Sequence, residues 1–153
     1  MRSAIGNSLL MSLVVIFVSA VMLLFVSVLS YSKAYRVKNG IIEIIEKNDG
    51  FTKTDADGNN VTEIEINDFL HKSGYRIGTS DCTKVLQDKG VNEIMQINSG
   101  YNYCVGKNST GEKGSYYTVI TYVEFNFPIV GSISPISVSG QTKMLEKNYD
   151  DYK

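Results

Sequence analysis

The chain has 153 residues and a formal net charge of −1, with 15 Lys and Arg residues against 16 Asp and Glu residues. Because these charges are interspersed, the sequence lacks the basic patch of a nucleic-acid-binding protein. A single histidine and two cysteines do not complete a four-ligand zinc site, and we expect neither a metal nor any other cofactor.

The amino-terminal stretch is strongly apolar. No charged side chain lies between Arg2 and Lys33, and Leu, Val, Ile, Phe and Met fill most of residues 9–29. At about 1.5 Å per helical residue, this segment is long enough to cross the roughly 30 Å hydrocarbon core of a bilayer. A cleaved signal peptide is the alternative, but the apolar region is too long and no cleavage site precedes a change of composition. The sequence therefore predicts a retained membrane helix.

Small residues recur inside this apolar segment. Ser12, Ser19 and Ser27 stand at near-heptad spacing. Such residues can form a face against another membrane helix. Serines are also common in membrane helices that have no such partner, so both interpretations stay open.

The helical pattern continues beyond the apolar segment. Val37, Ile41, Ile44 and Ile45 form an apolar stripe, and the charged residues lie elsewhere. Asn-Asp-Gly at residues 48–50 ends the helix. We predict one helix over residues 1–48, membrane-spanning first and amphipathic second. The remaining residues, 49–153, suffice for one extracytoplasmic α+β domain and not for two.

The domain is predicted to begin with a polar loop over residues 52–60. Asp55, Asp57 and Asn59 alternate like the start of a calcium loop, but Asn60 and Ile66 stand where an EF-hand needs Gly and Glu. An ordinary turn is therefore the better interpretation.

A short helix is expected next, with Thr62 as its cap and Gly74 at its end. Ile66, Phe69 and Leu70 face inward on this helix, and His71 beside them is interpreted as a surface residue. Residues 85–97 fit a helical turn followed by either a strand or a second helix, and their type stays open.

From Gly100 the sequence alternates with a period of two. We predict strands over residues 101–105, 115–127 and 135–145, the second with one buried face and the third with Ile136 and Val138 inward. An antiparallel sheet of this size needs apolar cover, which the isoleucine stripe of the long helix can provide. The strand tyrosines are either ordinary packing residues or exposed aromatic contacts for partners; they are Tyr101, Tyr103, Tyr116 and Tyr122.

Cys82 and Cys104 both lie in the domain. A disulfide between them would close a loop of about 23 residues and stabilise the domain by about 3 kcal/mol. Two reduced, buried thiols are the alternative. A disulfide favours an extracytoplasmic domain, whereas Lys33, Arg36 and Lys38 after the apolar segment favour a cytosolic one. We expect the domain to lie outside.

This plan resembles that of the type IV pilins, a membrane helix that continues into a helix packed on an antiparallel sheet. More closely, the segments NSLLMSLVVIFVSAVMLLFVSVLSYSKAYRVKNGIIEIIE, YNYCV, YYTVITYVEFNFPIV and ISVSGQTKML resemble the TadE/TadG-like pseudopilins of tight-adherence systems. The likeness extends over most of the chain.

The resemblance implies a minor structural subunit of a surface pilus or secretion filament, inserted with its amino terminus in the cytoplasm. Its partners would be the membrane, other pilin or pseudopilin subunits and the assembly platform. A prepilin peptidase would cut after Gly6, which makes Asn7 the first mature residue. The chain has Met11 where such pilins usually carry Glu, so either Gly6 is not a processing site or the protein is a tip or priming subunit.

Two further classes compete with this interpretation. The chain could be a single-pass, membrane-tethered binding or sensor module unrelated to pili. An enzyme is disfavoured, because the sequence has no Gly-rich phosphate loop and no Ser-His-Asp constellation. We therefore expect no catalytic residues and no small-molecule substrate.

Overall fold

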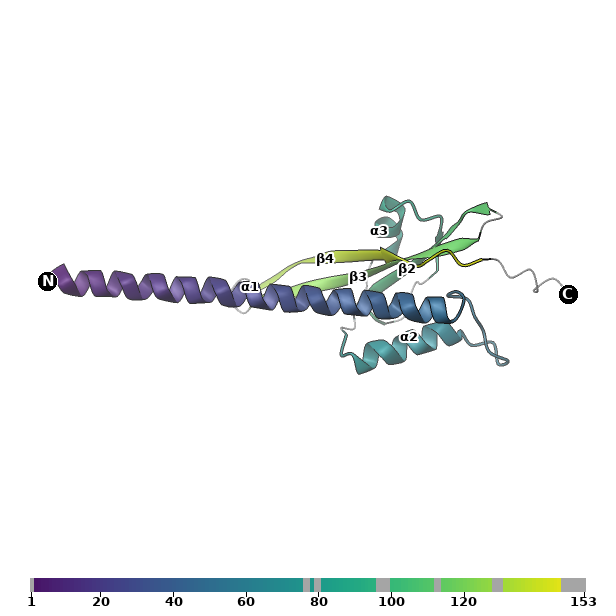
Figure 1. Ribbon diagram of the computed structural model, residues 1–153, viewed down its shortest axis with the longest axis horizontal. Coiled ribbons are helices and arrows are strands. Elements are labelled where there is room, and N and C mark those ends of the chain that lie inside the picture. The colour runs from purple at the N-terminus through teal and green to yellow at the C-terminus, as the bar shows by residue number, and fades with distance from the viewer. Residues whose placement is uncertain are drawn as a thin grey trace.

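A computed structural model describes residues 2–75, 78, 81–95, 100–111, 114–127 and 131–146, without the side chains of residues 2–7, 124–127 and 131–135. Figure 1 shows one long helix with a small domain gathered along its carboxyl-terminal half. This helix, α1, runs without a break over Arg2–Lys47. The predicted α+β class is confirmed, because an apolar helix packs against an antiparallel sheet.

Helix α1 ends where the sequence predicts. Asp49 and Gly50 take positive φ angles of 54° and 144°, and the Gly50 amide donates to the Ile45 carbonyl oxygen at 3.0 Å. Glycine adopts such angles without the steric cost that a Cβ atom brings. The chain therefore turns back at this point, and the domain begins to pack on the helix that precedes it.

The second helix, α2, covers Val61–Lys72, and its cap differs from the prediction. The Asn60 side chain, not Thr62, caps the helix by accepting a hydrogen bond from the Glu63 amide at 3.0 Å. Thr62 is fully buried, and its hydroxyl donates to the Gly50 carbonyl oxygen at 3.0 Å. Thr62 thus ties the start of α2 to the end of α1, while Gly74, with a φ of 59°, terminates α2.

Within the described residues the sheet has four antiparallel strands in the order β1-β2-β3-β4, in agreement with the prediction of at least three. They are β1, Glu93–Ile94; β2, Tyr103–Ser109; β3, Ser115–Phe127; and β4, Gly131–Gln141. The region of open type contains helix α3, Cys82–Asp88, and then β1. Strand β4 begins earlier than expected and includes Pro135, which a strand at the edge of a sheet tolerates because one side needs no ladder donor.

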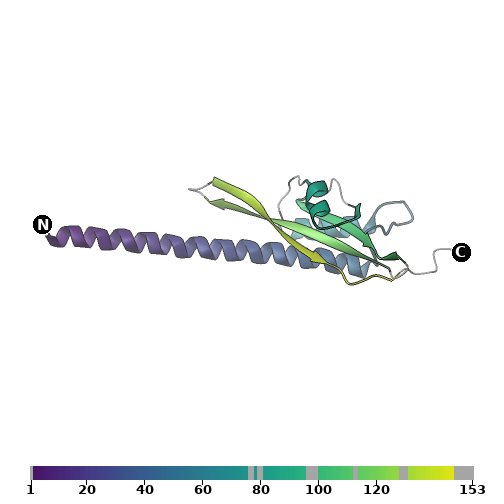
Figure 2. The same ribbon diagram turned by 90° about the horizontal axis from the view of Figure 1, so that it is seen from above.

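Both faces of the sheet are covered, so the prediction of one buried face is wrong. Tyr117, Val119 and Val123 are buried on the side of α1. On the opposite side Ile120 is fully buried beneath α3. A Cβ atom added to Gly106 of β2 would overlap the Val91 side chain, so glycine allows this close approach. Figure 2 shows α3 on the face of the sheet turned away from α1.

The structure corrects one further expectation about side chains and decides between the two interpretations of the strand tyrosines. Ile136 was expected to face inward with Val138, but Ile136 is 51% exposed and Val138 only 8%. Tyr103 is completely buried, and Tyr101, Tyr116 and Tyr122 are only partly exposed. The strand tyrosines are thus mainly packing residues and do not form a freely exposed aromatic surface.

Candidate functional site: the two halves of the long helix

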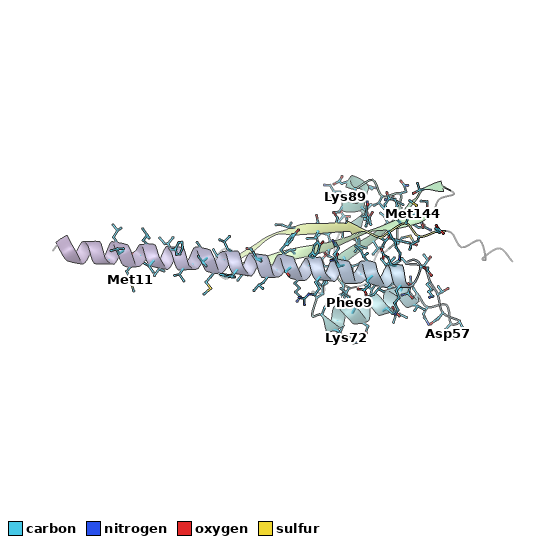
Figure 3. All side chains as sticks on the ribbon, viewed as in Figure 1. Met11, Asp57, Phe69, Lys72, Lys89 and Met144 are labelled. Atoms are coloured by element: carbon cyan, nitrogen blue, oxygen red, sulfur yellow. A yellow bond between two sulfur atoms is a disulfide. The ribbon has the colours of Figure 1, made fainter. Side chains whose placement is uncertain are left out.

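The first half of α1 has no cover from the domain. Its exposed large apolar side chains between Leu9 and Leu29 have 44% to 70% of their surface accessible. Figure 3 shows Met11 projecting from this half, far from the folded domain. A monomeric soluble protein rarely exposes a continuous apolar surface of this extent. The helix is long and apolar enough to span a membrane.

The three serines of this half satisfy their hydroxyl groups within the helix. Ser12, Ser19 and Ser27 each donate to the carbonyl oxygen four residues earlier, at 2.8 to 3.1 Å. A serine bonded in this way leaves no unpaired donor in an apolar surrounding. Its small side chain also allows another helix to approach closely. Whether a second helix packs there stays a prediction, as does processing between Gly6 and Asn7, whose backbones lie within α1.

The second half of α1 belongs to the core of the domain. Val37, Ile41 and Ile45 are at most 1% exposed, whereas Ile44 is partly buried at the edge of the stripe. They pack with side chains of the sheet, of α2 and of the segments that follow α1 and β4; the buried members are Phe51, Ile66, Leu70, Tyr75, Tyr103, Val105, Tyr117, Val119 and Leu145. The stripe is therefore centred on Ile41 and Ile45.

Polar contacts fix the position of the helix along the sheet. The buried Thr121 hydroxyl of β3 donates to the Ala34 carbonyl oxygen at 3.1 Å. At the other end of the packed half, the Glu46 carboxylate accepts a hydrogen bond from the Lys143 amide at 2.7 Å. A sliding movement of α1 would break both contacts, so the helix and sheet have one register.

Helix α2 approaches α1 closely at Gly40. A Cβ atom at this position would overlap the ring of Phe69, which Figure 3 places between the two helices. Nearby, the Glu65 carboxylate accepts hydrogen bonds from the Asn48 amide at 3.0 Å and from the Lys47 ammonium at 3.3 Å. The Asn48 amide first, and then Lys47, lower the pKa of Glu65.

Cys82 and Cys104 form the predicted disulfide, with a Cα–Cα distance of 5.4 Å. The bond joins α3 to β2 and lies beside Leu86 and Ile120 in the second, smaller core. The bond restricts the conformations of the unfolded chain, and it thereby stabilises the packing of α3 on this face of the sheet.

Tyr75 links distant parts of the domain and was not among the predicted site residues. Its buried hydroxyl donates to the Asn102 carbonyl oxygen at 2.9 Å and accepts a hydrogen bond from the Tyr122 amide at 2.8 Å. Its partners are 27 and 47 residues away, so no local pattern marks it. The adjacent Gly74 carbonyl oxygen accepts a hydrogen bond from the Lys33 ammonium at 2.7 Å, which brings the end of α2 to α1.

The chemistry that these residues can support is limited. A cavity of about 200 Å³ lies beside this contact and includes Lys33, whose ammonium group already binds the Gly74 carbonyl oxygen. The calcium-like loop is a turn in which the Asp55 carboxylate accepts hydrogen bonds from the Asn59 and Asp57 amides at 2.8 and 3.0 Å, which lower the pKa of Asp55. Within the described part of the chain, no cluster of three or more His, Cys, Asp or Glu residues could hold a metal.

Comparison with protein-family models, curated protein sequences and solved structures finds no match. The architecture itself is pilin-like, with a long amino-terminal apolar helix packed on a four-stranded antiparallel sheet and a disulfide in the domain.

Proposed function

We propose that the chain is a membrane-anchored structural subunit, a TadE/TadG-like minor pseudopilin that contributes to the assembly of a surface pilus or secretion filament. One observation carries this proposal. The same unbroken helix is apolar and exposed in its first half, and in its second half it packs along one face against a folded domain. Such a helix joins an apolar surrounding to a water-soluble domain with no flexible connection between them.

The exposed half of α1 needs an apolar partner in every state of the protein. In the membrane the lipid tails cover it, since a segment of this length matches the hydrocarbon core. In a filament, the helices of neighbouring subunits would replace the lipid. The back-bonded serines favour both surroundings, because they leave no free hydroxyl donor and allow close approach of another helix.

An extracytoplasmic domain follows from the same proposal. The Cys82–Cys104 disulfide supports an oxidising compartment. Two of the basic residues that give the opposing signal also have structural roles. Lys33 binds the Gly74 carbonyl oxygen, and Lys38 is only 7% exposed, with its ammonium group 4.0 Å from the centre of the Tyr35 ring. The proposal assigns no catalytic role and no cofactor to the chain.

The test is to produce the full chain with and without an active prepilin peptidase and to measure its intact mass. We expect the peptidase to remove residues 1–6, so that the mature chain begins at Asn7. A Gly6→Val variant is the matched control and should stay uncut. Sheared surface filaments from cells with the complete assembly system should contain the wild-type chain.

A chain that stays full-length beside an efficiently processed control prepilin, and that is absent from the filament fraction, would contradict this function. That result would favour the tethered binding or sensor module, which needs neither processing nor assembly. An impermeant thiol reagent that labels Cys82 and Cys104 in intact cells only after reduction would support the extracytoplasmic location.

A further inference from the structure

We propose that the free end of the β3–β4 hairpin is a second membrane contact, seated in the interfacial region of the bilayer beside α1. The hairpin end is defined by residues 124–127 of β3 and 131–136 of β4. The proposal requires the apolar half of α1 to lie in a bilayer, but it does not depend on a role in pilus assembly.

The direction of β3 brings the hairpin toward the apolar half of α1. The Tyr117 hydroxyl lies close to Gly50, just beyond the carboxyl end of α1. Further along the strand, Thr121 bonds Ala34, and Val123 packs with Ala34. Strand β3 therefore runs antiparallel to α1 and ends toward the amino terminus.

The hairpin extends beyond the domain along this direction. From Val123 to Phe127 a strand advances by about 13 Å, at about 3.3 Å per residue. Ala34 lies about 7.5 Å beyond Leu29 along the helix, at about 1.5 Å per residue. The hairpin end thus passes the level of Leu29 by about 5 Å, a depth typical of elements that lie in a membrane interface. Figures 1 and 2 both show the hairpin reaching farther toward the amino terminus than the rest of the domain.

The composition of this region fits a lipid surface. Glu124, at the base of the hairpin end, is its one charged residue in the sequence, and no further charged residue occurs before Lys143. The strand ends carry apolar residues at Phe125, Phe127 and Ile133, and Phe125 and Ile133 are register partners. By contrast, the sequence of the β2–β3 connection contains one acidic and one basic residue, Glu112 and Lys113. The two ends of the sheet therefore differ in the solvent that they favour.

Ile136 gives a direct observation of an uncovered apolar side chain in this hairpin. It is paired with the buried Val123, yet 51% of its surface is exposed. Val138, which stands two residues farther from the hairpin end, is 8% exposed. The cover that α1 provides is thus lost between Val138 and Ile136, where the hairpin leaves the domain.

The backbone sets a limit on the depth. In the described register, β2 pairs with β3 only as far as Thr121, and β4 is the last strand of the sheet. Strand edges that lack a partner cannot enter the hydrocarbon core, because no water is there to bond their amide and carbonyl groups. The interface supplies water and lipid headgroups for these edges while it accepts the apolar side chains.

The experiment places an environment-sensitive fluorophore on single cysteines of the full chain, with the Cys82–Cys104 disulfide kept intact, in phosphatidylcholine nanodiscs that hold one copy each. The sites are exposed positions along β4 and its extension: Ile136→Cys near the hairpin end, Ser139→Cys farther away, and Met144→Cys at the far end of the domain. Nitroxide groups on lipid headgroups, or on the upper acyl chain, report the contact by quenching.

We expect headgroup nitroxides to quench the probe at position 136 several-fold more strongly than at position 144, with position 139 between them. Water-like emission at position 136, quenched no more than at position 144, would overturn the proposal. The same measurement in nanodiscs that hold several copies tests the other occupant. If the probe at position 136 is shielded only there, and lipid nitroxides do not quench it, the occupant is a second copy and the proposal is overturned. A probe at Phe17→Cys tests the anchor separately, since absence of acyl-chain quenching there would mean that α1 is not in the bilayer.

Discussion

The place of α1 in the core can be tested at Ile41, whose side chain is completely buried against the sheet and α2. Replacing it with alanine removes three carbon atoms from a packed site. Substitutions of this kind cost about 2–5 kcal/mol, which combines the lost burial with the cavity that remains. For a domain of this size, a loss of about 3 kcal/mol corresponds to a decrease in Tm of roughly 12–24 °C.

The assay is urea unfolding of the full chain in a mild detergent, followed by near-ultraviolet circular dichroism. The chain has ten tyrosines and no tryptophan, so the tyrosine band reports the packing of the domain. Far-ultraviolet dichroism is a poorer probe, because detergent keeps the apolar half of α1 helical after the domain unfolds. Ile64→Ala, at a position of α2 that is 55% exposed, is the matched control and should change the free energy of unfolding by about 0.5 kcal/mol or less.

Ile44→Ala should give an intermediate loss, since Ile44 is only partly buried at the edge of the same stripe. If Ile41→Ala unfolds at the same urea concentration as Ile64→Ala, the reasoning is refuted. The sheet and α2 would then form a stable unit by themselves, with α1 as an attached rod and not as a part of the core.

Two other expectations concern the disulfide and acid. Reduction of Cys82–Cys104, or its replacement by two alanines, should lower the free energy of unfolding by about 3 kcal/mol in the same urea assay, and an unchanged midpoint would contradict the stabilising role of the bond. Because contacts in the folded state lower the pKa of Glu65, its carboxylate stabilises the fold above the ordinary value of 4.5, and this contribution is lost as the pH falls through the lower, folded-state value. A Glu65→Gln variant should therefore lose less stability than the wild type on acidification below pH 4.5. Urea midpoints measured across that pH range test this. Equal losses in the two proteins would mean that the contacts with Asn48 and Lys47 do not favour the charged form of Glu65.

The sequence was most informative where a long element repeats one period. The stripe through Val37, Ile41 and Ile45 was predictable because a helix of this length returns to the same face many times, and each return carries an apolar residue. The end of α1 was predictable for a different reason, since Asp49 and Gly50 tolerate the left-handed conformations that stop a helix.

Short elements and distant contacts could not be predicted in the same way. Strand β1 covers only Glu93–Ile94, which is too short to display a period. The second buried face of the sheet was missed because Thr118 and Tyr122 made the alternate positions of β3 look polar, although Ile120 between them is fully buried. From the sequence alone Gly40 is only a poor helix-forming residue. Its role depends on Phe69 of α2, whose ring occupies the place of a Cβ atom at this position.

In the candidate site, too, the features with a local sequence signal were predictable, and those that depend on distant contacts were not. The apolar half of α1 and the disulfide follow from composition and from the cysteine pair. The processing site at Gly6 and Asn7 and the serine face stay predictions, because each depends on another molecule. Tyr75 had no local signal, since its hydroxyl acts only after β3 and the segment at Asn102 have been brought together.

The unbroken α1 has a mechanical consequence for any assembly of this protein. Lys33 and Ala34 follow the apolar half of the helix closely and already bond the domain, so no flexible linker separates that half from the fold. Removing the helix from a bilayer therefore moves the whole domain, and the β3–β4 hairpin with it, as one body. In the proposed filament, a surface that replaces the lipid around α1 would also have to cover the hairpin end beside it, so neighbouring subunits would need apolar side chains at both heights.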